Sequence, residues 1–313
     1  MIKIVDLFAG IGGIRRGVEN AIGKKKVKCV FTSEWDKFAA KSYMLNYPGE
    51  KVHGDITQIN EKDIPNHDIL LAGFPCQPFS QAGLKKGFDD TRGTLFFDIK
   101  RILSHKQPSV VLLENVKRLR SHNKGETLKI IIKELNSIGY NNLYIDVLSA
   151  RNFGLPQNRE RIYIVGFLDD KINFSFPNPK SNKQTKVGDI LESNVDDKYT
   201  ISDKLWEGHK RRKKENREKG KGFGYGIVDE NSEYTNTISA RYYKDGSEIL
   251  IAQKDKNPRK LSPREAANLQ GFPRTYKIGV SDVQAYKQFG NSVAVPVIEA
   301  IAKEIYKSAF SNK

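Results

Sequence analysis

Short apolar runs alternate with segments of helical spacing over about the first 168 residues. The apolar runs predict strands at Ile2–Leu7, Lys28–Ser33, Asp68–Ala72, Ser109–Leu113, Leu143–Ser149 and Arg161–Phe167. The segments between them predict helices at Arg16–Ile22, Lys37–Asn46, Leu95–Leu103 and Thr127–Ile138. This alternation predicts an α/β fold with a mostly parallel, twisted sheet covered by helices on both faces. Ligands of such sheets bind beyond the carboxyl ends of the strands.

The pattern changes after Phe167. Residues from about 170 to 258 are polar and rich in Asn, Lys, Gly and Tyr, with a basic run at Lys210–Lys221. Helical spacing resumes in Pro263–Gln270 and Val293–Lys307. We therefore expect a main domain of residues 1–169 and 259–313, interrupted by a smaller domain of residues 170–258.

The charge of the chain narrows the class of partner. The 313 residues include 53 Lys and Arg against 37 Asp and Glu, a formal net charge of +16. This excess favours a polyanionic partner, most often nucleic acid, although a lysine-rich composition also serves solubility. No apolar stretch approaches the about 20 residues of a membrane helix. The chain enters its first predicted strand at once, so we expect no signal peptide and a cytoplasmic protein without membrane partners.

Cysteine and histidine usage argues against a disulfide framework or a structural metal site. The chain has two cysteines, Cys29 and Cys76, and five scattered histidines that do not combine with cysteine into a ligand spacing. Cys29 lies inside a predicted strand, where a small core residue is the ordinary role. We expect no disulfide and no bound metal.

Cys76 stands in a different setting. It belongs to the segment Gly73–Ser80, which directly follows the predicted strand Asp68–Ala72. Pro75 and Pro78 restrict the backbone on either side of it. A cysteine in a loop at the carboxyl edge of the sheet, among polar neighbours, is better placed for a reactive role than for the core.

A glycine turn and two carboxylates indicate the kind of cofactor. Asp6–Gly13 ends the first strand and opens a helix, and its glycines let the backbone approach a ligand closely. Arg15 stands where the dinucleotide fingerprint G-x-G-x-x-G requires its last glycine, so the turn does not match a dinucleotide-binding site. Glu34, after the second strand, is placed to bind ribose hydroxyls, and Asp55 to take an adenine amino group. Together these features favour an adenosyl cofactor.

Two further polar groups follow the later strands. Glu114, in Glu114–Val116, comes after the predicted strand Ser109–Leu113, where a partly desolvated carboxyl group can donate a proton near neutral pH. Arg159 and Arg161 are two residues apart at the start of the last strand, so we expect both to point to one side. Such a pair suits the bidentate grip of a carbonyl or phosphate, but surface salt bridges explain it equally well.

These segments, in this order, resemble the DNA cytosine-C5 methyltransferase family over nearly the whole chain. The glycine turn and the Pro-Cys, Glu-Asn-Val and Gln-x-Arg-x-Arg segments match its motifs, and three further blocks match as well. The matching segments are Asp6–Gly13, Gly73–Ser80, Glu114–Val116, Gln157–Arg161, Asp90–Leu95, Arg264–Pro273 and Gln288–Val293. The family resemblance implies a Rossmann-like methyltransferase fold with a smaller target-recognition domain.

The resemblance also implies a mechanism. Cys76 attacks carbon 6 of a flipped-out cytosine as a thiolate, and Glu114 protonates or hydrogen-bonds N3. Carbon 5 then becomes nucleophilic and takes the methyl group of S-adenosylmethionine. Arg159 and Arg161 hold the base and order the loop that carries Cys76. The residues expected to line the cofactor pocket are Phe8, Gly10, Gly12, Glu34, Trp35, Asp55, Ile56, Pro75, Leu95, Asn291 and Ser292.

The polar region resembles the recognition domain of the Dcm-type subgroup, whose targets are CC-GG-like, in Gly222–Gly226 and Thr237–Tyr243. Thr237 matches a family position that contacts the target strand. We expect Arg241 to contact a guanine, although a phosphate contact fits it equally. The basic run Lys210–Lys221 either grips the DNA backbone or is a solvated helix face. Two residues of the cysteine loop are also expected to touch DNA, Gln77 and Ser80.

Three other classes of protein fit the sequence less well. Amino-group methyltransferases carry an Asp/Asn-Pro-Pro-aromatic tetrad, which is absent here. A related enzyme acting on tRNA cytosine shares the fold but is expected to lack the Dcm-like block. A non-catalytic DNA-binding relative is expected to have lost Cys76, Glu114 or an arginine of the pair, and all are intact. We therefore expect a monomer acting on double-stranded DNA, with a cognate restriction endonuclease as a functional but not a physical partner.

Overall fold

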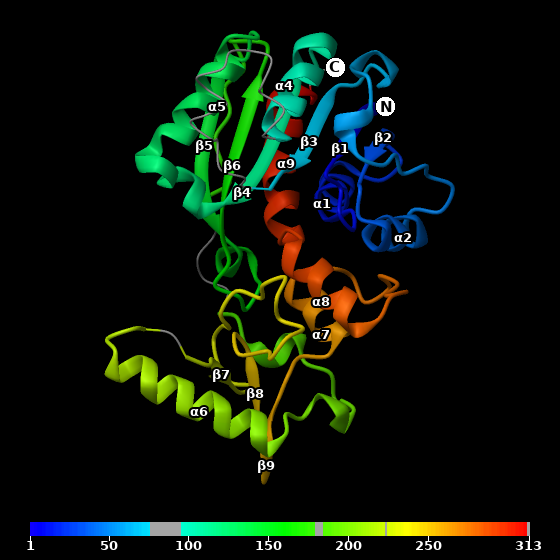
Figure 1. The fold of residues 1–313 in the computed structure, drawn as a ribbon. Helices are drawn as coiled ribbons and strands as arrows, with labels where there is room; N and C mark the ends of the chain where they lie inside the picture. The colour runs from blue at the N-terminus through cyan, green and yellow to red at the C-terminus, as the bar shows by residue number, and fades with distance from the viewer. Residues whose placement is uncertain (76–94, 179–183, 223, 312–313) are drawn as a thin grey trace. The chain divides into compact units, whose positions relative to one another are not determined.

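The computed structural model describes residues 1–75, 95–178, 184–222 and 224–311. The chain divides into two compact units, which Figure 1 shows as ribbons. The sheet unit comprises residues 1–148, 160–178 and 297–313, and the second unit comprises residues 149–159 and 179–296. Both units are therefore built from segments that are separated in the sequence.

A six-stranded sheet forms the centre of the sheet unit, in the order β2-β1-β3-β4-β6-β5. Strands β1 to β4 pair in parallel, and β6 runs antiparallel to β4. The predicted mostly parallel α/β sheet is thus confirmed. The strands are β1 Ile2–Leu7, β2 Val27–Ser33, β3 Ile69–Gly73, β4 Val110–Val116, β5 Asn142–Ser149 and β6 Glu160–Phe167.

Helices cover the sheet because its strands carry apolar side chains on both faces. Val5 and Leu7 of β1 belong to a core that includes Ile99 of α4 and Ile131 of α5. Asp6 lies between them in the strand and faces the opposite side. The helices of this unit are α1 Gly13–Ile22, α2 Lys37–Asn46, α4 Leu95–Lys106, α5 Glu126–Asn136 and α9 Val295–Ala309, the last of which begins in the second unit.

The second unit contains a small sheet in the order β7-β8-β9, with helices α6, α7 and α8. A buried ion pair joins β9 to α7: Arg259 donates to both carboxylate oxygens of Glu265 at 2.7 and 2.8 Å. Glu265 also forms the capping box of α7 with Ser262. The elements are β7 Ile227–Val228, β8 Leu250–Gln253, β9 Lys256–Arg259, α6 Asp203–Glu218, α7 Pro263–Leu269 and α8 Asp282–Asn291.

The structure corrects two details of the predicted elements near the motifs. Strand β4 continues to Val116, so Glu114 lies within the strand and not after it. Strand β6 begins at Glu160, so Arg159 precedes it and does not share a strand face with Arg161. The first error arises because the apolar run marks only the buried centre of β4, whereas backbone pairing extends beyond it. The second arises because residue spacing does not show where pairing begins, and in β6 it begins one residue after Arg159. Among the helices in the described part of the chain, none combines the length and the apolar character that a membrane crossing requires.

Helices α1 and α9 pack closely at Gly17. A Cβ atom at this position would lie 2.6 Å from the Cβ of Ile298 and 2.9 Å from the backbone nitrogen of Glu299. Neither contact can be relieved by rotating a side chain, so α1 can approach α9 this closely only with glycine at position 17.

We expect Gly17→Ala to lower the thermal stability of the protein, at a cost of about 1–3 kcal/mol for overpacking. The matched control is Gly208→Ala, because an added Cβ at this glycine of α6 meets no atom within 4 Å. There alanine should leave stability unchanged or raise it by about 0.5–1 kcal/mol through helix propensity. Thermal unfolding followed by circular dichroism compares the two variants, and equal effects would contradict the packing argument.

Candidate active site

The carboxylate of Glu114 is held by strand pairing at the carboxyl end of β4. Val116 lies opposite Arg161 in the β4–β6 register, which makes Glu114 and Arg161 diagonal neighbours on one face. The Nε atom of Arg161 lies 3.3 Å from Oε1 of Glu114, and the two side chains are only 15% and 11% exposed. A largely buried carboxylate is thus fixed in place by a neighbouring guanidinium.

Asn115 fixes the approach to the cysteine segment, and sequence analysis assigned it no role of its own. Its side chain is buried, and its Nδ2 donates a hydrogen bond of 2.9 Å to the backbone carbonyl of Phe74. Gly73 also pairs with Glu114 in the β3–β4 register. The backbone leading to Pro75, which is exposed, is therefore tied to the strand that carries Glu114.

The predicted nucleophile lies outside the described residues. This holds for Cys76 and for the two neighbours expected to touch DNA, Gln77 and Ser80. Their roles stay predictions. The other cysteine, Cys29, is buried in β2, as expected of a core residue.

Arg159 is buried within the second unit and binds backbone carbonyls there. Its guanidinium donates to the carbonyls of Ile238 at 3.2 Å and Gly290 at 3.1 Å, and also to that of Ser292. Gln157, fully buried, accepts a hydrogen bond of 3.1 Å from the amide of Ile238. The Gln-x-Arg segment thus holds the Thr237–Tyr243 region against the end of α8, a role that residue spacing alone did not reveal.

The glycine turn after β1 has the open backbone that a ligand requires. Gly10 and Gly12 both have positive φ, of 55° and 81°, a conformation that favours glycine. A Cβ atom at Gly12 would lie 2.5 Å from the ring of Tyr47, whereas one at Gly10 would meet no atom within 4 Å. Gly12 is therefore required for packing, and Gly10 leaves space at the turn.

Glu34 lies beside this turn, as predicted from its place after β2. One carboxylate oxygen accepts a hydrogen bond from the amide of Gly10 and the other from the amide of Asp36, each at 2.8 Å. Burial raises the pKa of the Glu34 carboxyl above its usual value, and the two amides oppose that shift. The next residue, Trp35, is 78% exposed, so its ring has a free face.

Asp6, in β1 just before the glycine turn, belongs to a cluster of buried polar residues. Asp6 is fully buried, and burial raises the pKa of its carboxyl to about 7, although the nearby Arg15 opposes the shift. Arg15 pairs with Glu19 at 2.6 Å and with Glu50 at 2.8 Å. Its guanidinium carbon also lies 4.0 Å from the ring centroid of Tyr47. Arg15, noted only because it breaks the dinucleotide fingerprint, is thus a central structural residue.

The remaining predicted site residues differ in their settings. Asp55 is exposed and caps the short helix Ile56–Gln58, in which Ile56 itself is buried. Thr237 donates its hydroxyl to the carbonyl of Asn158, and the side chain of Arg241 is exposed. The others are half-buried or lie at element ends: Phe8 after β1, Leu95 at the start of α4, and Asn291 and Ser292 at the end of α8.

Comparison with solved structures identifies the fold. The solved S. pombe Dnmt2 methyltransferase matches with a TM-score of 0.80 at 22% identity, covering 98% of this chain and 99% of that one. A methyltransferase from Entamoeba histolytica matches with a TM-score of 0.75 at 21% identity, covering 98% of each chain. At these identities the matches show the fold alone, which is that of a Rossmann-like methyltransferase.

Sequence comparison shows the family. The model of the C-5 cytosine-specific DNA methylases matches residues 2–307, and the chain belongs to that family. Type II methyltransferase M.NlaX of Neisseria lactamica is 65% identical over 311 residues, covering 99% of this chain and 98% of that protein. A DNA-cytosine methyltransferase of Escherichia coli (strain K12) is 42% identical over 370 residues, covering 96% of this chain and 76% of that protein.

The resemblance found in the motifs is thereby confirmed. The protein is a DNA (cytosine-5-)-methyltransferase, its methyl donor is S-adenosylmethionine, and its substrate is DNA. The residues around the glycine turn fit that donor. Glu34 offers a carboxylate suited to ribose hydroxyls, Trp35 offers an exposed ring suited to stacking on adenine, and Gly10 leaves open space.

We expect Arg161→Lys to slow methyl transfer on the order of tenfold or more, because lysine lacks the planar guanidinium that orients Glu114. The measurement is the single-turnover rate at saturating DNA. Arg118→Lys, at an exposed position just after β4, is the matched control and should leave the rate unchanged. An unchanged rate for Arg161→Lys, with normal thermal stability, would remove Arg161 from the active site.

We expect the buried Asp6 carboxyl to make stability depend on pH. Because its folded-state pKa of about 7 exceeds the usual aspartate pKa of 3.8, the folded protein holds a proton that the unfolded chain lacks between these values. Stability from this group is therefore lost as the pH rises from about 4 to about 7. Asp6→Asn removes the effect, so its melting temperature relative to wild type should increase by several degrees between pH 5 and pH 8.

The control for this measurement is Asp170→Asn, which removes one exposed carboxylate from the same unit. Its melting temperature should follow that of the wild type at every pH. A difference between Asp6→Asn and wild type that does not change with pH would contradict the buried titration.

Proposed function

We propose that this enzyme methylates carbon 5 of a flipped-out cytosine within a short, CC-GG-like duplex sequence, as the modification enzyme of a restriction-modification system. The observation that carries the proposal is the end-to-end identity of 65% with a protein named a type II methyltransferase. A second relative with that description, M1.ScrFI of Lactococcus lactis subsp. cremoris, is 62% identical over 315 residues. The Dcm-like segments Gly222–Gly226 and Thr237–Tyr243 support the CC-GG-like target.

The proposed reaction begins at Cys76, whose thiolate adds to carbon 6 of the cytosine. Glu114, oriented by Arg161, donates a proton or a hydrogen bond to N3, so that the electron pair displaced from the ring is stabilised. S-adenosylmethionine, when bound, supplies the methyl group that carbon 5 accepts. A solvent base then removes the carbon-5 proton, and the ring electrons return to expel the Cys76 thiolate.

Target reading is assigned to residues 170–258, with the rest of the chain forming the catalytic and cofactor-binding domain. Arg159 and Gln157 act here by holding the backbone at Ile238, which supports the neighbouring Thr237 against the target strand. We assign a guanine contact to Arg241, whose exposed side chain is compatible with it. One copy of the chain suffices for this arrangement, so the proposed active form is a monomer.

The proposal is tested by incubating purified protein with S-adenosylmethionine and a plasmid of known sequence, followed by bisulfite sequencing. We expect protected cytosines confined to one short CC-GG-like motif. Protection at a different motif would refute the target assignment but not the chemistry. Methylation of tRNA in place of the plasmid would refute the DNA target.

The two cysteines provide a matched pair of variants for the mechanism. Cys76→Ala should abolish methylation while DNA binding persists, because no other thiol can add to carbon 6. Cys29→Ala should retain methylation, since that buried thiol lies in the interior of β2. A Cys76→Ala protein that still protects the plasmid would overturn the mechanism.

A further inference from the structure

Helix α6 of the second unit has an inner face that is bound to the rest of the unit. His209 is 2% exposed, and its Nε2 lies 3.2 Å from the backbone carbonyl of Asp245. Three residues on, Arg212 grips the carboxylate of Asp245 through both terminal nitrogens, each at 3.1 Å. These contacts hold the middle of the helix and account for one of its cations.

A second anchor uses the aromatic side chains at one flank of the helix. The rings of Trp206 and Tyr225 are 4.8 Å apart, and Nζ of Lys213 lies 4.2 Å from the ring centroid of Tyr225. Both contacts join α6 to the segment before β7. Lys213 is therefore a second cation with a structural role.

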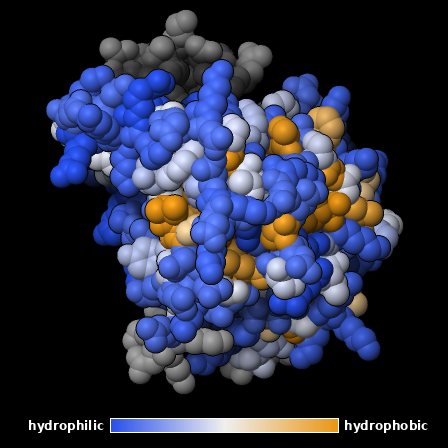
Figure 2. Space-filling model, turned by 90° about the horizontal axis from the view of Figure 1, so that it is seen from below, coloured by the Kyte–Doolittle hydropathy of each residue, from blue (hydrophilic) through white to orange (hydrophobic). Residues whose placement is uncertain are grey.

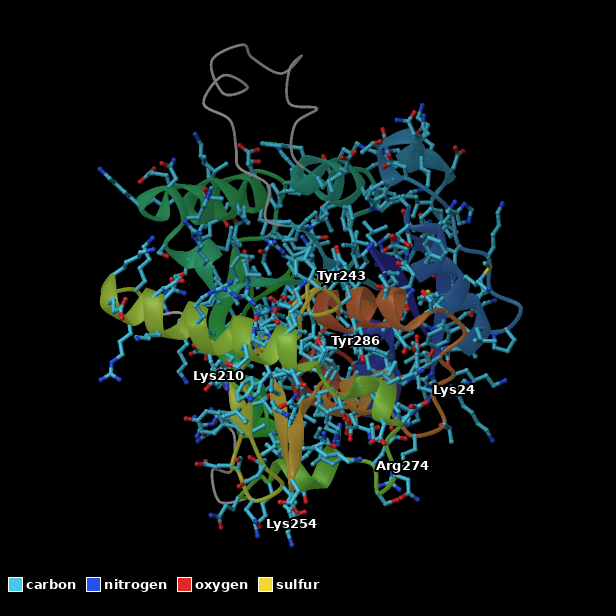
Figure 3. The ribbon with its side chains drawn as sticks, turned by 60° about the horizontal axis from the view of Figure 1, so that its bottom comes forward. Lys24, Lys210, Tyr243, Lys254, Arg274 and Tyr286 are labelled. Carbon is cyan, nitrogen blue, oxygen red and sulfur yellow. The ribbon has the colours of Figure 1, made fainter. Side chains whose placement is uncertain are left out.

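A face of α6 beside this inner face carries further cations, of which Lys210 also has its Nζ 5.5 Å from the ring centroid of Trp206. Lys210, Lys214, Arg217 and Lys221 follow one another at spacings of four, three and four residues, which places the first three on one helix face and Lys221 just past its end. We call these four residues the outer ridge. All are exposed, and Figure 3 labels Lys210 on the helix. Hydrophilic residues also predominate on the face of the molecule that Figure 2 shows.

Folding of the unit does not account for the outer ridge. Lys210 pairs with Glu207, but Lys214, Arg217 and Lys221 form no ion pair with any residue in the described ranges. Lys214 has cations at i−4, i−3 and i+3 against one carboxylate, that of Glu218 at i+4, and like charges at such spacings destabilise a helix by about 0.2–0.5 kcal/mol per pair. A polyanion bound along this face would turn the repulsion into attraction.

We propose that the outer ridge of α6 binds the backbone phosphates of duplex DNA beside the recognised sequence, without reading bases. At 1.5 Å per residue, Lys210 and Arg217 are about 10.5 Å apart along the helix. Phosphates of one strand recur about every 3.4 Å along the duplex axis, so the ridge spans about three steps. This inference rests on the proposed assignment of residues 170–258 to DNA reading.

The chemistry of the helix favours nucleic acid over an anionic membrane surface. A membrane-surface helix presents an apolar face to the lipid beside its basic face. In α6 the inner face contains His209 and Arg212, which form hydrogen bonds within the unit and offer no apolar surface to a lipid. A row of cations alone supplies the electrostatic contact that phosphates take and that carries no sequence information.

The test compares two double variants of the full chain that each remove one lysine and one arginine. The ridge variant is Lys214→Gln with Arg217→Gln. The control is Lys254→Gln with Arg274→Gln, at exposed positions of the second unit outside α6 that Figure 3 labels. Dissociation constants are measured without methyl donor, over a series of salt concentrations, for a duplex with the target sequence and an unrelated duplex.

The logarithm of the association constant falls linearly with the logarithm of the salt concentration, by about 0.9 for each phosphate contact. Because the ridge variant lacks two cations, we expect its slope to be less negative by about two. Its affinity at about 0.1 M salt should fall on the order of tenfold for both duplexes, so that the ratio between them is preserved. The control should keep the wild-type slope. Single-turnover methylation at saturating DNA should be unchanged in both variants.

Three results would overturn the inference. A wild-type slope for the ridge variant would show that α6 contacts no phosphates, and a loss confined to the target duplex would assign the ridge to base reading. Salt-dependent binding to anionic lipid vesicles that the ridge variant alone loses, with DNA binding intact, would assign it to a membrane. Failure of the proposed function appears separately, as a wild-type protein that binds DNA but leaves the plasmid unmethylated.

Discussion

The antiparallel pairing of β6 with β4 is the constraint on which the proposed catalytic edge depends. It brings Arg161 diagonally across from Glu114 and buries both side chains, so a carboxylate and a guanidinium are held by backbone register and not by flexible loops. The parallel pairing of β3 with β4 adds Gly73 beside Glu114, and Asn115 ties down Phe74. The entry to the cysteine segment is thus fixed by the same strand that carries the acid.

Much of this fold was predictable because the strands of a covered sheet are apolar on both faces, and their runs are visible in the sequence. The direction of β6 was not, because a buried strand has the same apolar run whichever way it is paired. Helix α6 was seen only as a basic run, since its buried side includes His209 and little that is apolar. The position of Glu34 at the carboxyl edge of the sheet followed from its place directly after a parallel strand, whereas the carbonyl contacts of Arg159 depend on a distant loop and helix end.

The two units use charge in different ways. Around the glycine turn of the sheet unit, burial raises the pKa of Glu34 and Asp6, and backbone amides and Arg15 oppose that effect. In the second unit, Arg259, Arg212 and Arg159 are each committed to a carboxylate or to carbonyls. A net charge of +16 is therefore a poor guide to the DNA-binding surface until the structural cations have been set aside.

The boundary between the two units passes between Arg159 and Glu160, inside a single five-residue motif. Gln157 and Arg159 are bonded to the Thr237–Tyr243 region and the end of α8, whereas Arg161 belongs to the sheet. A chimaera made by exchanging only the contiguous residues 179–296 would keep the old Gln157 and Arg159 beside a new Thr237–Tyr243 region. The part of the chain that packs as one unit is discontinuous, so an exchange that preserves these contacts has to include residues 149–159.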